Sequence, residues 1–227
     1  SLGAVSCGVS AVELAGGGMV VSSCRQSGTT NVPAIRLFNG TGWLPWEQPS
    51  NVPTFGTPQV AAWADGQIHF LSRGKGNAIA HWTRSSAGVW TSVALGTSAV
   101  VPPLLAPYQG RLVAALVNAG AVSVASFNGV WATTPLSSGL LATGDVSIVY
   151  IDGAIEVFAR RSADSAFYRN RLWRGLEMGW SLIGSRSYSG SPAAFAVAAG
   201  PVENKSPFLV GSGSYPASAL VLTRTPY

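Results

Sequence analysis

The stretch Asp65-Gly66-Gln67-Ile68-His69-Phe70-Leu71-Ser72-Arg73 joins a turn signal to a run that contains the apolar residues Ile68, Phe70 and Leu71. A second apolar run, residues 58–64, precedes the turn. An Asp-Gly pair between two such runs is typical of a tight β-hairpin. The segment therefore predicts two antiparallel strands.

The same pattern recurs when the chain is aligned on its turn glycines, Gly18, Gly66, Gly110 and Gly153. Three of the four runs that follow end in arginine at the same offset. Each unit continues with a third apolar run and then a tryptophan, and the tryptophans are separated by 47, 41 and 49 residues: Trp43, Trp90, Trp131 and Trp180. Four strands per unit at a period in the forties are typical of a β-propeller blade.

A fifth unit follows but ends before a fourth strand. Ser1-Leu2-Gly3-Ala4 resembles Ala94-Leu95-Gly96-Thr97, which follows Trp90, so we expect residues 1–6 to complete the last blade and close the ring. The prediction is a single all-β domain: a five-bladed β-propeller with four-stranded antiparallel blades at 8–50, 51–97, 98–140, 141–188 and 189–227 plus 1–6. A fragment of a larger ring is the alternative. We expect the unit-ending tryptophans to lie between blades with partnered indole N–H groups.

Composition excludes several classes of protein. The chain has 227 residues, of which 47% are hydrophobic and only 10% charged, so it is too apolar to be disordered. The net charge is +5, but the clustered arginines fall on two predicted strands, so no nucleic-acid partner is expected: Arg160, Arg161, Arg169, Arg171 and Arg174. The uncharged stretch 112–144 is interrupted by Asn, Gly and Pro, so no membrane span is predicted.

The two cysteines, Cys7 and Cys24, flank the first predicted hairpin. A disulfide between them suits an oxidising compartment and predicts a secreted protein. A turn centred on Gly17-Gly18 would place Cys24 opposite Ala11, so the bridge needs a bulge or another turn centre. Two reduced, buried thiols are the alternative.

Catalytic signatures are absent from the sequence. It contains no zinc-protease helix motif, nucleophile elbow, phosphate loop or dinucleotide fingerprint, and only two histidines, His69 and His81. We therefore expect no cofactor, no metal site and no enzymatic activity. A glycosidase remains an alternative because some adopt propeller folds, and it would need two converging carboxylates. Only Glu13 and Asp145 lie at or beside predicted innermost strands.

Carbohydrate binding is better supported, because four tryptophans outside the repeat occur beside polar groups. An aromatic ring can stack on the apolar face of a sugar while Arg, Glu and Asn bind its hydroxyls. Core packing is the alternative for each tryptophan. The predicted ligand-binding residues are Trp46, Glu47, Trp63, His81, Trp82, Arg84, Tyr168, Arg171, Trp173 and Arg174.

The tryptophan-ending units, with the segments 65–70 and 152–160, resemble the repeats of bacterial β-propeller lectins of the fucose-binding kind. The resemblance implies a secreted lectin that binds fucose-like or other surface glycans in grooves between blades. The third unit lacks the arginine that ends the second strand in the other three units, and it has no acidic residue. We therefore expect its ligand site to be incomplete. The chain also resembles the lectin subunits of secreted umbrella toxin particles, which implies an adaptor or toxin protein as a partner. A protein-docking scaffold is the alternative function.

Overall fold

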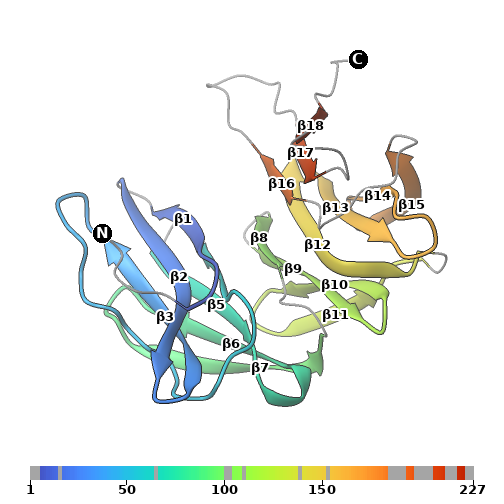
Figure 1. Ribbon diagram of the computed structural model, residues 1–227. Coiled ribbons are helices and arrows are strands. Elements are labelled where there is room, and N and C mark those ends of the chain that lie inside the picture. Colours follow the sequence, from blue (N-terminus) through green and yellow to red (C-terminus); the bar gives the residue numbers. More distant parts are fainter. Residues whose placement is uncertain are drawn as a thin grey trace. The chain divides into compact units, whose positions relative to one another are not determined.

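A computed structural model describes residues 6–14, 17–63, 66–99, 104–108, 111–137, 140–151, 154–183, 193–196, 207–212 and 219–222. These residues form strands β1 to β18 and one short 3₁₀ turn (Figure 1). The strands are grouped in five sheets, and in each sheet neighbouring strands follow one another along the chain. Every pairing whose register is described is antiparallel.

The first sheet contains β1 (Ser10–Leu14), β2 (Gly18–Ser27) and β3 (Thr30–Phe38). The second contains β4 (Gln59–Ala62), β5 (Ile68–Arg73), β6 (Ala78–Arg84) and β7 (Trp90–Ser98), with the 3₁₀ turn η1 (Lys75–Asn77) between β5 and β6. The third contains β8 (Leu104–Tyr108), β9 (Arg111–Asn118), β10 (Ala121–Phe127) and β11 (Trp131–Pro135). The fourth contains β12 (Ala142–Ile151), β13 (Ala154–Arg161), β14 (Phe167–Trp173) and β15 (Leu176–Ile183). The fifth contains β16 (Ala193–Ala196), β17 (Pro207–Ser212) and β18 (Ala219–Leu222).

The chain divides into two compact units. The first unit comprises residues 1–112 and 127–131, and the second comprises residues 113–126 and 132–227. The all-β fold and the recurrence of antiparallel sheets along the chain confirm the sequence pattern. The number of blades and the closure of a ring stay predictions, because residues 1–5 of the proposed closing segment 1–6 lie outside the described residues.

The first sheet has three strands where four were predicted. The position of the fourth is taken by two isolated bridges, Ile35 with Glu47 and Phe38 with Trp43. The backbone N–H of each residue in the first pair donates to the other's carbonyl at 2.9 Å. This pairing fixes Glu47 beside β3.

The core of the first unit lies on both faces of the second sheet. Successive strand residues point to opposite faces. One face packs with the first sheet in a cluster of buried residues: Val20, Ile35, Val60, Ile68, Phe70 and Trp82. The other face packs with the third sheet through Ala61, Leu112 and Phe127. Packing on both faces explains why five consecutive residues of β5, Ile68 to Ser72, are all buried.

Two of the unit-ending tryptophans pack beside these clusters as expected. Trp90 is partly buried against the first cluster, and Trp131 is partly buried against the second. Their indole N–H groups donate to Glu47 and His81, respectively. The predicted role between sheets, with a partner for each N–H group, is confirmed for this pair. The expected partner is missing for Trp180, whose buried Nε1 has no hydrogen-bond partner among the described residues.

The predicted disulfide joins Cys7 and Cys24, with 5.3 Å between their Cα atoms. Leu14 pairs with Gly18 and Ser10 with Ser22, so the hairpin is not centred on Gly17-Gly18. Continuing that register places Cys24 opposite Gly8, next to Cys7. The different turn centre therefore removes the need for a bulge.

The described part of the chain contains no helix with the length and apolar character of a membrane span.

Candidate functional site

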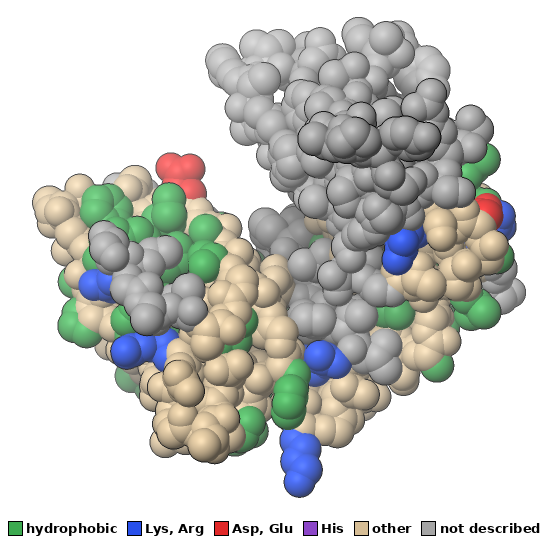
Figure 2. Space-filling view, in the orientation of Figure 1, with side chains coloured by type: hydrophobic (Ala, Val, Ile, Leu, Met, Phe, Trp, Pro, Cys, Tyr) green, Lys and Arg blue, Asp and Glu red, His purple; other side chains and the backbone are tan. Residues whose placement is uncertain are grey.

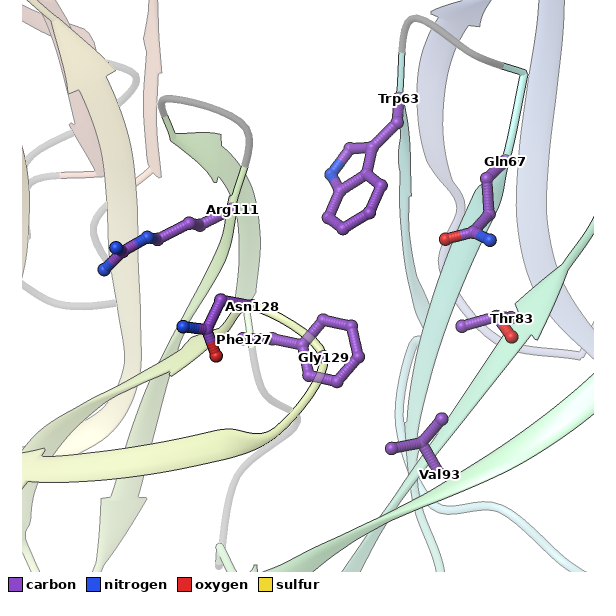
Figure 3. Close-up of a pocket in the computed structure, with 8 residues that line it drawn as sticks. All are labelled: Trp63, Gln67, Thr83, Val93, Arg111, Phe127, Asn128 and Gly129. Carbon is purple, nitrogen blue, oxygen red and sulfur yellow. The ribbon is translucent and has the colours of Figure 1, made fainter.

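A cleft of about 530 Å³ opens within the first unit (Figure 3). We call it the Trp63 cleft. The second sheet and its β4–β5 turn form one side, and the start of β9 and the end of β10 with its following turn form the other. The cleft is lined by Trp63, Gln67, Thr83, Val93, Arg111, Phe127, Asn128 and Gly129.

The register of the second sheet brings one side of the cleft together. Ala61 pairs with His69, His69 pairs with Thr83, and His81 pairs with Val93. The backbone N–H of Trp63 donates to the Gln67 carbonyl at 2.9 Å. Since directly paired residues share a face, the Trp63, Gln67, Thr83 and Val93 side chains lie on the same face of the sheet.

Gly66 closes the turn that carries Trp63. Its N–H donates to the Trp63 carbonyl at 3.0 Å, and its φ of +82° lies in the left-handed region that favours glycine. This is the hairpin glycine from which the repeat was aligned. The local sequence thus sets the position of Trp63 at the mouth of the hairpin.

Two aromatic rings form the wall of the cleft. The Trp63 and Phe127 rings are stacked, with centroids 6.5 Å apart and planes 30° from parallel. Behind them, the His69 ring lies 4.2 Å from that of Trp63. The buried Trp63 Nε1 has no hydrogen-bond partner among the described residues. Leaving such a donor unpaired costs roughly 1–3 kcal/mol, so an acceptor that reached it would stabilise the site.

A hydrogen-bonded chain of side chains supports this wall. Trp131 Nε1 donates to His81 Nδ1 at 3.1 Å, and His81 Nε2 lies 3.0 Å from His69 Nδ1. An indole N–H can only donate, so His81 accepts through Nδ1 and, when neutral, donates through Nε2 to His69. The edge of the His81 ring also meets the Phe127 ring at 4.9 Å. The chain therefore fixes the rings that form the cleft.

His81 is neutral at ordinary pH. Burial, followed by the nearby His69, lowers the pKa of His81 from 6.5 to about 3. The side chain is fully buried, so it supports the wall from behind and does not contact a ligand in the cleft.

The described part of the chain holds no group of three or more His, Cys, Asp or Glu that could bind a metal.

Polar groups surround the aromatic wall. Figure 3 shows the Gln67 carboxamide directed toward the two rings and the Thr83 side chain below it. Arg111 and Asn128 line the other side and are exposed, and Figure 3 shows their guanidinium and amide groups directed away from the two rings. None of the described lining residues is Asp or Glu. The cleft thus offers the Gln67 carboxamide beside an apolar surface.

Two residues of the first unit that were predicted to bind a ligand form a contact with each other instead. Arg84 donates from Nε and Nη2 to the two carboxylate oxygens of Glu47 at 2.7 and 2.8 Å. Trp90 Nε1 donates to Glu47 Oε2 at 3.0 Å. The predicted ligand groups Glu47 and Arg84 therefore bind each other and join β6 to the segment after β3.

The tryptophans predicted to stack on a ligand have different surroundings. Trp82 is only 8% exposed and packs in the core with Phe70, which corrects the expectation that its face is open to a ligand. Trp46 is half-buried, with the guanidinium carbons of Arg25 and Arg36 each 6.0 Å from its ring centre. Of the predicted residues, Trp63 is the one that lines the cleft.

The remaining predicted residues lie on or beside β14 in the second unit. The Tyr168 hydroxyl donates to Asp164 at 3.2 Å, and the Arg161 guanidinium carbon lies 4.4 Å from the Tyr168 ring centre. Trp173 is 43% exposed, and the Arg174 guanidinium carbon lies 4.8 Å from its ring centre. On the face drawn in Figure 2, the coloured Lys and Arg side chains are scattered rather than gathered in a stripe.

Most residues of the cleft were not predicted from the sequence, although the repeat contains a pattern that indicates two of them. Gln67 follows Gly66 and Arg111 follows Gly110, so the two sides of the cleft use equivalent positions of neighbouring units. Phe127, Asn128 and Gly129 lie at the β10–β11 turn, where the sequence shows no matching motif. Comparing the residues next to each turn glycine could have found the first pair.

Comparison with known proteins shows the fold. No protein-family model matches the chain, and no curated protein sequence matches it. The six-bladed β-propeller lectin of Aleuria aurantia matches with a TM-score of 0.60 and 16% identity, over 96% of this chain and 78% of the lectin. The SapL1 lectin, solved with α-methyl fucoside, matches with a TM-score of 0.61 and 12% identity, over 95% and 78%.

A hydrolase has a similar structure. Zg3597, a family 117 glycoside hydrolase from Zobellia galactanivorans, matches with a TM-score of 0.55 and 13% identity, over 85% of this chain and 73% of the hydrolase. The chain therefore has a fold like that of β-propeller lectins, and the same likeness extends to enzymes that act on carbohydrates. Function has to be argued from the site.

Proposed function

We propose that the chain binds a saccharide in the Trp63 cleft and does not alter it chemically. The observation that carries the proposal is the stacked pair Trp63 and Phe127 beside the carboxamide of Gln67. A pyranose has an apolar C–H face that fits an aromatic wall and hydroxyls that both donate and accept hydrogen bonds. The unpaired Trp63 N–H would donate to a ring or hydroxyl oxygen.

The size of the cleft fits a small sugar. Its volume of about 530 Å³ falls within the range of small-molecule sites, roughly 300–1,000 Å³. Val93 adds an apolar surface next to the rings, which suits the methyl group of a fucose-like sugar. We therefore propose a neutral, methyl-bearing monosaccharide or the end of a surface glycan as the ligand.

The absence of acidic residues among the described lining residues supports binding over hydrolysis. Glycoside hydrolysis ordinarily uses two carboxylates placed on either side of the scissile bond. The described lining residues supply none. A hydrolase would release nitrophenol from aryl glycosides, and replacing Asp145 by Asn would abolish that release. We expect no turnover above the buffer rate.

Isothermal titration calorimetry with α-methyl fucoside, galactose, mannose and glucose tests the proposal. We expect Trp63→Ala to weaken the best ligand at least about tenfold, equal to about 1.4 kcal/mol. Asn128→Ala serves as a second cleft variant, chosen because its position is exposed and its side chain is not part of the core. Lys75→Gln is the control, because it changes an exposed side chain that does not line the cleft. Equal losses in all three variants, or no binding by the folded wild type, would overturn the proposal.

Narrower parts of the proposal concern where the protein acts. The Cys7–Cys24 disulfide supports an oxidising, extracellular compartment. We propose that the protein is secreted and recognises a cell-surface glycan. The most specific form of this proposal is that it is the target-recognition subunit of a toxin particle. Co-purification of a stoichiometric adaptor or toxin protein from culture supernatant tests that form.

A protein-docking scaffold is the second candidate. It is favoured by three large apolar side chains on the outer strand β15: Leu176, Met178 and Leu182, which are 68%, 67% and 52% exposed. A stoichiometric partner lost on Met178→Lys, together with no glycan binding, would favour the scaffold over the lectin.

A further inference from the structure

A second group of potential ligand-binding side chains lies on one face of β13 and β14, within the second unit. Glu156 pairs directly with Arg171, Phe158 with Arg169, and Ala154 with Trp173. Directly paired residues of antiparallel strands point to the same side of the sheet. Glu156, Arg169, Arg171 and Trp173 therefore share a face, which we call the Arg171 face.

A buried carboxylate holds two guanidinium groups at this face. Glu156 is fully buried, and neither of its carboxylate oxygens has a hydrogen-bond partner among the described residues. Glu156 Oε1 lies 3.7 Å from Arg171 Nε and 3.9 Å from Arg169 Nη1. A buried carboxylate is costly unless cations compensate it, so Glu156 keeps both arginines on the same part of the sheet.

The outer parts of the same groups are open to a ligand. The Arg169 and Arg171 side chains are 37% and 27% exposed, and Trp173 is 43% exposed. Arg174, which stacks on Trp173, adds a third guanidinium. Three guanidinium groups against one carboxylate leave a net charge of +2. Such a group favours an anion, and the planar guanidinium matches the oxygens of a carboxylate or sulfate.

The Arg171 face can be compared, position by position, with the second sheet of the first unit. His69 is the third residue after its turn glycine and pairs with Thr83, while Glu156 is the third residue after Gly153 and pairs with Arg171. The fourth sheet thus carries charged residues where the second sheet carries a neutral pair. The two sheets therefore differ in charge at equivalent positions.

We propose that the Arg171 face is a second binding site, specific for an acidic saccharide. The carboxylate or sulfate of the sugar binds Arg169 and Arg171, and the sugar ring stacks on Trp173. The inference goes beyond the neutral-sugar cleft and does not depend on it, because no residue is shared between the two sites.

Calorimetry with trigalacturonate tests this site, and fully methyl-esterified trigalacturonate is the matched neutral probe. A sulfated galactose disaccharide distinguishes sulfate from carboxylate recognition. We expect the ester to bind at least about tenfold more weakly than the acid, and affinity for the acid to fall as salt rises from about 50 to about 200 mM. Arg171→Gln should weaken the acid at least about tenfold. Lys75→Gln, which removes an exposed charge elsewhere, should change it less than about twofold.

Because Arg171→Gln leaves Glu156 with one cation fewer, Trp173→Ala provides a second variant at an exposed position. It should weaken trigalacturonate without changing neutral-sugar binding, while Trp63→Ala should do the reverse. Equal affinity for acid and ester, loss of acid binding in Trp63→Ala, or no effect of Trp173→Ala would overturn the proposal. Tighter binding of oligo(dT) at the same residues would also overturn it, in favour of a nucleic-acid partner.

Discussion

Acidification tests the hydrogen-bonded histidine chain behind the Trp63 cleft. Burial and the neighbouring His69 lower the pKa of His81 from 6.5 to about 3 in the folded protein. The unfolded chain therefore binds a proton at His81 below about pH 6.5, whereas the folded protein does not. Stability supplied by neutral His81 is complete above that pH and is lost progressively as the pH falls toward 3.

The size of the effect follows from the shift. Each pH unit below the unfolded pKa costs about 1.4 kcal/mol of unfolding free energy for one proton. Between pH 6.5 and about 4.5, His81 alone should cost roughly 3 kcal/mol. The hydrogen-bonded ion pair with Arg161 lowers the pKa of Asp164 to about 2. The Asp164 carboxylate therefore affects the pH dependence of stability only below the interval between pH 6.5 and about 4.5.

Urea unfolding of the wild type and of His81→Gln at several pH values measures the difference. Gln keeps an acceptor and a donor but does not titrate, so the variant should be less stable near pH 7 and lose about 3 kcal/mol less on acidification to about pH 4.5. Comparison of the two curves removes the contribution of the carboxylates common to both proteins. Parallel pH curves would refute the reasoning, because they would mean that His81 takes up its proton equally in both states.

Three further predictions concern stability. Glu47→Gln should lower the unfolding free energy by about 1–2 kcal/mol, since it weakens charged contacts to Arg84 and the bond from Trp90; a denaturation midpoint equal to the wild type would contradict this role. Trp82→Ala should cost about 3–5 kcal/mol because the ring lies in the core, and a fully stable variant with reduced sugar affinity would instead support the ligand-stacking role. Reducing the disulfide, whose cysteines are 17 residues apart, should cost about 3 kcal/mol in a melt with and without dithiothreitol, and unchanged curves would contradict it.

The sequence predicted the strands well because turn glycines and alternating apolar runs are local signals. Gly66 and the run that follows it form the hairpin expected of them. The pairing of Cys7 with Cys24 was also foreseen, but its turn centre was not, because three consecutive glycines, Gly16 to Gly18, allow several registers. The fourth strand of the first unit was expected and is reduced to two bridges.

The site was harder to predict because side-chain burial depends on which sheets meet. Trp63 and Trp82 look alike in sequence, yet one lines a cleft and the other packs against the first sheet. Glu47 and Arg84 are distant along the chain, and their mutual ion pair has no local signature. Phe127 joins the cleft only through contacts between the second and third sheets. Local patterns therefore predict strands, whereas the composition of the site needs tertiary structure.

The most direct test of carbohydrate binding in the Trp63 cleft is a titration followed by the ¹⁵N–¹H signals of the eight tryptophan indoles. Each signal is assigned by its loss in a single Trp→Phe variant. With the sugar that calorimetry identifies, the Trp63 signal should shift most and the core Trp82 signal should stay in place. A bound sugar that shifts other indoles and leaves Trp63 unmoved would contradict the account.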